Sequence, residues 1–306
     1  MTMQEKELIL RDGHRLFYRV WEVESPKATV HINHGMAEHS LRYADFAGYL
    51  NTLGFSVYAQ DHRGHGYTAE EDERGWFAES DGALTVVEDS YELDERIMEE
   101  NPGIPHFVFG HSMGSFITRA VITLHPIYDA AVICGTGADQ GIVGKVGRMI
   151  ARHHAKKWGS RMQDADLDRL AFGGFNKKFP NDGDFAWLSR DRKQVQKYID
   201  DPLCGFVCSS GFYADLVDLV SMANSRERAE NINRNMPMFI ISGAMDPVGG
   251  FGKGIEKVNA FYRKVGIKDL QMKLYPDCRH EILNELDNRK VYEDVGEFLT
   301  RCLEKK

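Results

Sequence analysis

The most informative part of the sequence is Phe107-Val108-Phe109-Gly110-His111-Ser112-Met113-Gly114. An apolar run precedes the pattern G-x-S-x-G, and a helical pattern over residues 116–124 follows it. This order predicts a buried strand, a sharp turn and a helix, the setting of a nucleophile elbow. Small residues beside the serine let strand and helix approach closely, and the helix N-terminus favours developing negative charge. We therefore predict that Ser112 is a catalytic nucleophile; the alternative is a tight turn in a non-catalytic doubly wound fold.

Length and charge narrow the class of protein. A chain of 306 residues is long enough for one large α/β domain or two small ones. The net charge of −8 argues against general nucleic-acid binding, which requires a basic surface. The N-terminal residues are polar and show no apolar signal region, and no run of the sequence has the length of a membrane span.

The five cysteines show no spacing of a disulfide framework. With no export signal visible, we expect reduced thiols and a cytoplasmic protein. Cys204 and Cys208 have too few neighbouring ligands for a zinc site, and we interpret them as small apolar residues. The sequence predicts no metal and no cofactor, and it leaves the oligomeric state open.

Short apolar runs alternate with helical patterns along most of the chain. Such alternation predicts an α/β fold with a mostly parallel central sheet and helices on both faces. The first two strands are expected to form a hairpin around Asp12-Gly13. The expected strands are 7–10, 16–21, 28–33, 55–59, 107–109, 130–134, 238–242 and 270–275, and the expected helices are 43–53, 84–98, 116–124, 255–265 and 290–303.

The alternation stops between the sixth and seventh expected strands. Residues 136–234 contain helical, polar and glycine-containing stretches without a convincing strand. We predict a helical cap, 136–234, inserted after the sixth strand at the active-site edge of a core formed by 1–135 and 235–306.

A serine hydroxyl needs a base within hydrogen-bond reach, and in this type of fold an acid and then a histidine follow the serine along the chain. Asp246 is the only carboxylate in the loop after the first strand beyond the insertion, although an Asp-Pro pair is also a common turn signal. His280, one of twelve histidines, is the only one in the loop after the last strand. We predict that His280 is the general base and that Asp246 orients it.

Two backbone N–H groups are expected to form an oxyanion hole. One belongs to Met113, the residue after the nucleophile. The other is expected from the loop His34-Gly35-Met36 after the third strand, where Gly35 lets the backbone approach the substrate and Met36 donates. The alternative for this loop is an ordinary glycine turn.

Two further glycine-containing loops allow other interpretations. Residues 61–66, Asp-His-Arg-Gly-His-Gly, suggest a metal site, but no ligand spacing supports it, and we favour a hydrogen-bonded loop that braces the elbow. Residues 249–254 are glycine-rich but lack the Walker spacing, and we interpret them as a flexible turn that enters a helix.

Three motifs together resemble those of a known family. Residues 34–39, His-Gly-Met-Ala-Glu-His, followed by Arg42-Tyr43, resemble the HGxxEHxxRY stretch of monoglyceride lipases and related bacterial lysophospholipases. Residues 61–66 resemble the D-x-R/V-G-H-G loop of that group, and residues 110–114 resemble its GHSMG elbow. These proteins are α/β-hydrolases with a cap, often described as serine aminopeptidase-type hydrolases.

The resemblance covers both halves of the core and no motif of region 136–234. It implies an α/β-hydrolase fold, with Ser112, Asp246 and His280 as the triad and Met36 and Met113 as oxyanion donors. Ser115 and Ala37 stand where the family commonly has glycine.

One segment of the expected cap is amphipathic with a basic side. Ile142, Val146, Met149 and Ile150 share a helical face, and the remainder is rich in lysine and arginine, including Lys156 and Lys157. One interpretation is peripheral contact with a lipid surface. The other is a helix whose apolar face packs on the core and whose charged face is solvated.

These observations predict a serine hydrolase of carboxylic esters, with monoacylglycerols or lysophospholipids as the expected substrates. A small-ester carboxylesterase or a peptidase like proline iminopeptidase would use the same fold and triad. A ligand-binding protein on a hydrolase fold is the non-enzymatic alternative. Haloalkane dehalogenases and epoxide hydrolases are disfavoured because they have aspartate at the position of Ser112.

Overall fold

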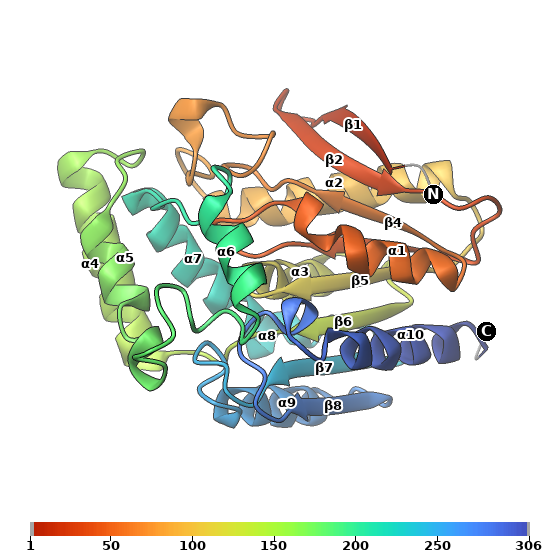
Figure 1. The fold of residues 1–306 in the computed structure, drawn as a ribbon. Coiled ribbons are helices and arrows are strands. Elements are labelled where there is room, and N and C mark those ends of the chain that lie inside the picture. The colour runs from red at the N-terminus through yellow and green to blue at the C-terminus, as the bar shows by residue number, and fades with distance from the viewer. Residues whose placement is uncertain (1–2, 305–306) are drawn as a thin grey trace.

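The computed structural model describes residues 3–304, which form a central sheet with helices on both sides (Figure 1). The strands are β1 (Met3–Ile9), β2 (Arg15–Trp21), β3 (Ala28–Asn33), β4 (Phe55–Gln60), β5 (His106–His111), β6 (Ala130–Cys134), β7 (Met238–Gly243) and β8 (Leu270–Tyr275). The α-helices are α1 (Ala44–Thr52), α2 (Gly82–Glu100), α3 (Met113–Leu124), α4 (Gly141–Trp158), α5 (Ala165–Phe172), α6 (Arg192–Asp200), α7 (Ser210–Ala223), α8 (Arg226–Ala229), α9 (Lys253–Val265) and α10 (Asn288–Glu304). Short 3₁₀ helices are η1 (Ser40–Tyr43), η2 (Glu71–Glu73), η3 (Phe175–Lys178) and η4 (Ile282–Asn284).

The sheet has eight strands in the order β1-β2-β4-β3-β5-β6-β7-β8. Only β1 and β2 pair in antiparallel fashion with their neighbours, and the strands from β4 to β8 pair in parallel. Every residue of the central strands β3 to β7 is buried, as a parallel sheet covered on both faces requires. The predicted α/β fold with a mostly parallel sheet is confirmed.

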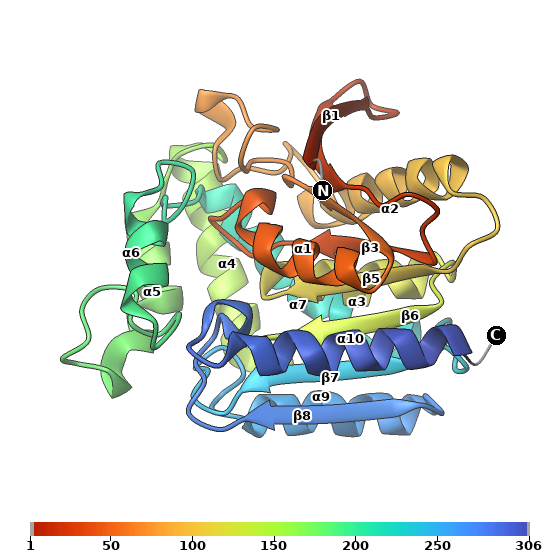
Figure 2. The same ribbon diagram turned by 45° about the vertical axis from the view of Figure 1, so that its right-hand side comes forward.

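Helices cover the two faces of the sheet in separate layers (Figure 2). Helices α1 and α10 pack on one face through a buried apolar cluster that includes Phe46 and Val295. Helices α2, α3 and α9 pack on the other face, where the cluster includes Val87, Ile117 and Val258. Because both faces are covered, only the edges of the sheet are open for a site.

Helices α4 to α8 all lie between β6 and β7 in the chain, beside the carboxyl ends of the parallel strands (Figures 1 and 2). This agrees with the expected helical character of 136–234; a single antiparallel bridge there joins Gln163 to Ser209. The division into a core and a separate cap stays a prediction.

Several element ends differ from those expected. The elbow helix α3 starts directly after Ser112 rather than at residue 116, because the turn itself provides its first residues. Strand β1 begins at Met3 rather than at residue 7, since backbone pairing of Met3 with Trp21 extends the hairpin through a polar stretch. The helix expected from residue 43 begins as the 3₁₀ turn η1. Within residues 3–304, no helix is both long and apolar enough to cross a membrane.

Candidate active site

Ser112 occupies the sharp turn between β5 and α3. Its backbone has φ 54° and ψ −120°, a conformation that is costly for a residue with a side chain. Two contacts hold it: the Ser112 N–H donates to the carbonyl of Cys134 at 3.0 Å, and the carbonyl of Ser112 accepts from the Ser115 N–H at 2.9 Å. The Ser115 hydroxyl donates to the same carbonyl at 2.5 Å. The side chain of Ser115 therefore adds a bond to the turn.

The glycines that flank Ser112 are required by close packing. A β-carbon on Gly110 would lie 2.3 Å from the carbonyl oxygen of Gly114. A β-carbon on Gly114 would meet the backbone of β3. Both contacts are far shorter than carbon and oxygen tolerate, so the elbow excludes larger residues.

The predicted acid and base meet at the neighbouring strand ends. Asp246 lies in the loop after β7 and is fully buried, and His280 lies after β8 with 2% exposure. His280 Nδ1 is 3.0 Å from Asp246 Oδ2. The distance is that of an ion pair, but the angle falls outside that of a hydrogen bond. Asp246 also accepts from the Ser242 hydroxyl at 3.1 Å and the Val248 N–H at 2.8 Å, which fixes the carboxylate.

Ser112 and His280 line the same cavity. Gly135 packs against His280 and against His111, the residue before Ser112: a β-carbon on it would be 3.3 Å from His280 Cε1 and 3.2 Å from His111 Cδ2. Within residues 3–304, no protein atom forms a hydrogen bond with the Ser112 hydroxyl, so the relay from Ser112 to His280 is not closed in this structure. The structure thus joins Asp246 to His280 directly and places Ser112 beside the pair.

The loop after β3 lies against the elbow, as expected for an oxyanion hole. A β-carbon on Gly35 would be 3.2 Å from Ser112 Cβ, so glycine permits this approach. Among residues 3–304, no oxygen accepts a hydrogen bond from the backbone N–H of Met36 or Met113. The backbone N–H groups of Met36 and Met113, which the sequence predicts as oxyanion donors, therefore have no acceptor in the described protein and lie near Ser112.

The shape of this loop depends on Ala37, which has φ 51° in the left-handed region. Glycine adopts such a φ without strain, whereas the β-carbon of alanine makes it costly. The carbonyl of Ala37 accepts from the Gly205 N–H at 2.9 Å, which ties the loop to the segment after α6.

The histidine-rich loop 61–66 is hydrogen-bonded to the oxyanion loop, and its expected role in bracing the elbow stays a prediction. His34 Nε2 accepts from the His62 N–H at 2.9 Å, and His34 Nδ1 donates to the carbonyl of Gly35 at 2.7 Å. These bonds define a neutral tautomer, and burial lowers the pKa of His34 accordingly. The imidazole of His34 thus links the backbone of His62 to the carbonyl of Gly35 and fixes the position of Gly35.

A cavity of about 1300 Å³ opens beside Ser112. It runs between α3, α4, α5 and α7, and its walls are mainly apolar. Representative wall residues are Phe116, Ile150, Leu167, Phe172, Leu216 and Val220. A long apolar ligand fits such a space better than a small polar one.

Segment 186–189 contacts the catalytic loop, a feature that the sequence did not indicate. The carbonyl of Trp187 accepts from the His280 N–H at 3.2 Å, and that of Leu188 accepts from the Glu281 N–H at 2.7 Å. The Trp187 ring also lies 5.1 Å from the imidazole of His280. No periodicity or motif marks these contacts, because they join residues about 93 positions apart through irregular backbone.

His39, Asp201 and Cys204 place one possible ligand atom each within 4.8 Å of one another, although the sequence analysis assigned no metal site. His39 Nε2 and Asp201 Oδ2 already contact each other at 2.9 Å, and burial raises the pKa of the Cys204 thiol. The cluster therefore ties the segment after α6 to the core through its own contacts.

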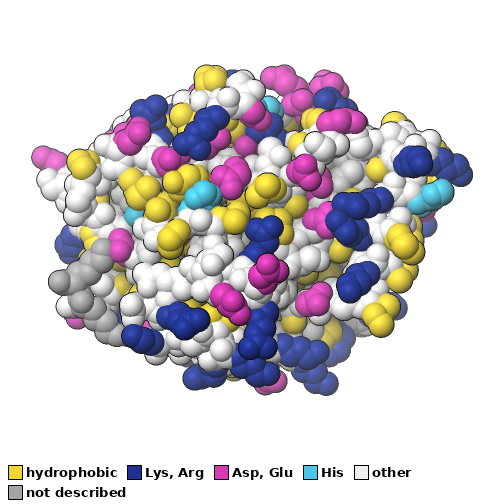
Figure 3. All heavy atoms as spheres, turned by 180° about the vertical axis from the view of Figure 1, so that it is seen from behind, with side chains coloured by type: hydrophobic (Ala, Val, Ile, Leu, Met, Phe, Trp, Pro, Cys, Tyr) yellow, Lys and Arg dark blue, Asp and Glu magenta, His cyan; other side chains and the backbone are white. Residues whose placement is uncertain are grey.

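Helix α4 exposes its apolar residues, contrary to one of the two interpretations of its pattern. Ile142 is 80% exposed, Met149 is 69% exposed and, in this helix, only Ala151 is buried. Arg148 and Arg152 pair with Asp218 of α7, although their side chains are 38% and 59% exposed. At the right-hand edge of Figure 3, where α4 lies, hydrophobic and basic side chains stand together on the surface. Of this apolar face, Ile150 packs against the core, whereas Ile142 and Val146 stay exposed and line the cavity beside Ser112.

The elbow, the strand order and the helices on both faces of the sheet define an α/β-hydrolase. A family model described as serine aminopeptidase, S33, matches residues 24–287, and the chain belongs to this family. The chain is similar to a monoacylglycerol lipase of Mycolicibacterium smegmatis, with 28% identity over 299 residues and 95% of each chain covered.

Two further proteins are similar to this chain over most of their length. Human monoglyceride lipase is 28% identical, and the alignment covers 96% of this chain and 89% of the human protein. The crystal structure of a thermostable carboxyl esterase from Bacillus coagulans, in complex with glycerol, matches with a TM-score of 0.89 and 28% identity, covering 99% of both chains.

Proposed function

We propose that the protein is a serine hydrolase that cleaves carboxylic esters through an acyl-enzyme at Ser112. The observation that carries this proposal is the strained elbow serine beside the contacting pair Asp246 and His280. His280 takes the proton of the Ser112 hydroxyl as the oxygen attacks the ester carbonyl, and returns it to the leaving alcohol. Water then repeats the sequence to release the acid. Asp246 orients the imidazole and stabilises its protonated form.

The backbone N–H groups of Met36 and Met113 serve as the oxyanion hole in this proposal. Both donors lie at the elbow and neither has an acceptor in the described protein. Donors of this kind stabilise the tetrahedral intermediate, and losing one typically costs about 3–4 kcal/mol of transition-state stabilisation.

The proposed substrates are monoacylglycerols or lysophospholipids. The large apolar cavity beside Ser112 suits a long acyl chain, and the similar proteins from Mycolicibacterium smegmatis and human carry monoacylglycerol lipase names. A peptidase would need a carboxylate for the substrate amine. Among the carboxylates that line the cavity, Glu38 and Glu281 are both paired with Arg42, and Asp168 accepts from the Tyr213 hydroxyl at 2.9 Å. Asp139 is the cavity carboxylate that remains for a substrate amine.

We further propose that α4 makes peripheral contact with a lipid surface. Its exposed apolar residues lie next to exposed lysines, the combination that binds anionic membranes. The variant Lys156→Gln/Lys157→Gln should lose activity on anionic vesicles and keep activity on soluble short esters. The control Lys264→Gln/Lys290→Gln removes equally exposed charges from α9 and α10. An equal effect on both substrates would remove the idea of membrane contact.

An active-site fluorophosphonate probe and an ester panel test the function. We expect labelling of Ser112, loss of labelling in Ser112→Ala, and rapid turnover with an optimum at long acyl chains when monoacylglycerol and lysophosphatidylcholine are compared. A preference for acetyl or butyryl esters would indicate a small-ester esterase instead. Tight retention of a ligand with negligible turnover would indicate a binding protein and refute the enzyme.

A further inference from the structure

The carboxylate of Glu38 is hydrogen-bonded to the oxyanion loop. Its Oε1 accepts from the Gly35 N–H at 2.6 Å and from the Tyr43 hydroxyl at 2.8 Å. The same oxygen lies 3.4 Å from Nδ1 of His111, the residue before the nucleophile. One buried carboxylate therefore contacts both the oxyanion loop and the elbow.

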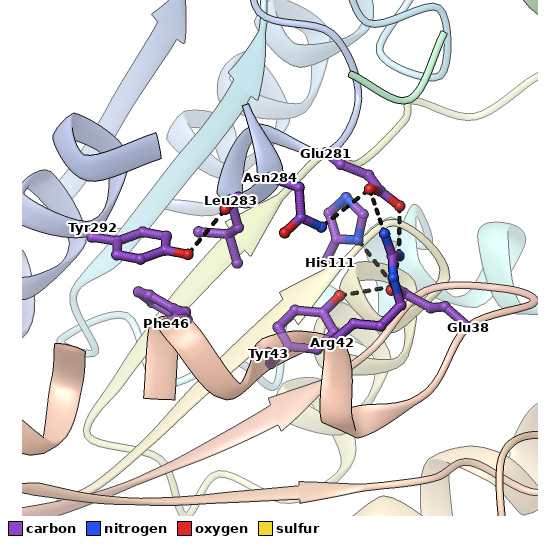
Figure 4. Close-up of a pocket in the computed structure, with 9 residues that line it drawn as sticks. All are labelled: Glu38, Arg42, Tyr43, Phe46, His111, Glu281, Leu283, Asn284 and Tyr292. Atoms are coloured by element: carbon purple, nitrogen blue, oxygen red, sulfur yellow. Dashed lines mark hydrogen bonds and ion pairs between the residues drawn. The ribbon is translucent and has the colours of Figure 1, made fainter. Parts of the chain in front are cut away.

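Arg42 extends this contact to the loop that carries the predicted base. Its Nη1 donates to Glu38 at 2.5 Å, and its Nη1 and Nη2 donate to the two carboxylate oxygens of Glu281 at 2.6 and 2.7 Å. Glu281 directly follows His280 in the chain. Figure 4 shows the guanidinium of Arg42 between the two carboxylates, with His111 beside them. The forked geometry of arginine makes such a bridge directional as well as strong.

His111 also contacts His280 directly, which links the elbow to the loop that carries the predicted base. The imidazole of His111 lies 4.8 Å from that of His280, and its Nε2 is 3.3 Å from the carbonyl of His280. The oxyanion loop, the elbow and the loop that carries His280 therefore all contact the network of Glu38, Arg42 and Glu281.

The carboxylates of the network are buried and share one arginine. Glu38 is 3% exposed and Glu281 is 4% exposed. Burial alone would raise the pKa of Glu38, but Arg42 and His111 outweigh it and hold that pKa well below its usual value. Buried ion pairs contribute little net stability compared with apolar residues of similar volume. A triad of charges at this position therefore calls for a role other than stability.

We propose that Glu38, Arg42 and Glu281 form a positioning device that fixes the oxyanion loop and the His280 loop relative to each other. None of the three contacts the reacting atoms. They act through Gly35 and His280. By fixing these two residues they keep the Met36 N–H and the His280 imidazole in position relative to Ser112. This inference rests on the proposed function and names residues to which the sequence analysis assigned no role.

The test uses the purified full chain with the variants Glu38→Gln, Glu281→Gln and Arg42→Lys. The first two keep the size of the side chain, and the third keeps the charge but loses the fork. We expect kcat for p-nitrophenyl butyrate to fall about ten- to a hundredfold, with KM changed by less than about threefold, and the rate of fluorophosphonate labelling to fall in parallel. Glu38→Gln/Glu281→Gln should lose less than the product of the single losses, because one guanidinium joins both carboxylates.

Asp94→Asn is the matched control. Asp94 is fully buried and accepts from His106 and Tyr128 at the amino-terminal end of β5, the end opposite to Ser112. This variant should lose thermal stability and keep the wild-type kcat. If Arg42→Lys does not fold, the two glutamine variants carry the test.

The outcomes separate this inference from the function on which it rests. If wild-type protein is neither labelled at Ser112 nor active on any ester, the proposed function fails. If the wild type is labelled and active while Glu38→Gln and Glu281→Gln keep its kcat and labelling rate, or their losses simply multiply, the positioning device is refuted.

Discussion

A β-carbon on Gly114 would lie 2.0 Å from the backbone carbonyl oxygen of Asn33. The start of α3 is thus pressed against the end of β3, the strand that leads into the oxyanion loop. The same hypothetical atom would lie 2.5 Å from the carbonyl oxygen of His34. The nucleophile and the oxyanion loop are therefore close together because position 114 has no side chain.

Gly114→Ala should damage both stability and catalysis. The added methyl group must displace backbone that has no room to move, a change that costs about 1–3 kcal/mol of unfolding free energy. Urea unfolding and ester turnover measure the two effects. Gly48→Ala is the control: a β-carbon there meets nothing within 4 Å inside helix α1, so that variant should gain about 0.5–1 kcal/mol. Equal stability of the two variants would contradict the packing argument.

Asp246→Asn should reduce kcat by about 10³- to 10⁴-fold while the protein stays folded. The amide can keep the bond from Val248 but cannot stabilise the imidazolium of His280. Steady-state kinetics with a soluble ester provide the measurement. Asp277→Asn makes the same chemical change at an exposed position of the His280 loop with φ 61°, which asparagine tolerates, and should leave kcat unchanged. Wild-type turnover by Asp246→Asn would remove Asp246 from the triad.

The His111–Glu38 contact should make stability depend on pH in the neutral range. Burial opposes the charged imidazole, but the hydrogen bond and charge of Glu38 outweigh it, so the pKa of His111 is raised above its ordinary 6.5. A pKa that is higher in the folded state adds stability that is complete below the unfolded pKa and is lost as pH rises through the folded pKa.

Urea unfolding at a series of pH values checks this expectation. The free energy of unfolding should decline as the pH rises above about 6.5 in the wild type, and that component should be absent in His111→Gln. His153→Gln changes an exposed histidine and should keep the wild-type dependence. Parallel curves for wild type and His111→Gln would show that the contact contributes nothing to folding.

Arg119→Met should destabilise the protein by several kcal/mol, because each buried acceptor left without a donor costs about 1–3 kcal/mol. Arg119 is fully buried in α3, and its guanidinium donates to the carbonyls of Gly137 and Ala223 at 2.9 and 3.0 Å and to the Tyr262 hydroxyl at 3.0 Å. Methionine fills the volume but leaves these acceptors unpaired. Thermal and urea unfolding measure the loss, and Arg263→Met on the exposed side of α9 is the control. A loss below about 1 kcal/mol would show that water replaces the guanidinium.

Local sequence patterns were sufficient for the mostly parallel character of the sheet and for the place of the elbow, but they did not give the order of the strands. Mainly apolar runs of three to six residues located the parallel strands, and G-x-S-x-G between a strand and a helix located Ser112. Chain order led to Asp246 and His280, and in the structure Asp246 Oδ2 lies 3.0 Å from His280 Nδ1. The catalytic roles of both residues stay predictions. Element ends were less accurate because pairing with a neighbouring strand, as at β1, overrides local preference.

The incompletely packed apolar face of α4 shows the limit of inference from a sequence pattern. Periodicity established that the helix is amphipathic, but the side that faces the core depends on partners such as Asp218 of α7. An amphipathic pattern has the same appearance whether its apolar stripe meets protein or solvent.

The sequence alone determined the fold class and the order of the elbow, acid and histidine loops, since these follow from strand and helix periods and from turn residues that act over a few positions. Only the tertiary structure decided that Glu38, Arg42 and Glu281 meet, and that Trp187 lies on His280. Arg42 and Glu281 are 239 residues apart. Their contact depends on the stacking of whole strands and loops in space, and no local rule of spacing encodes it.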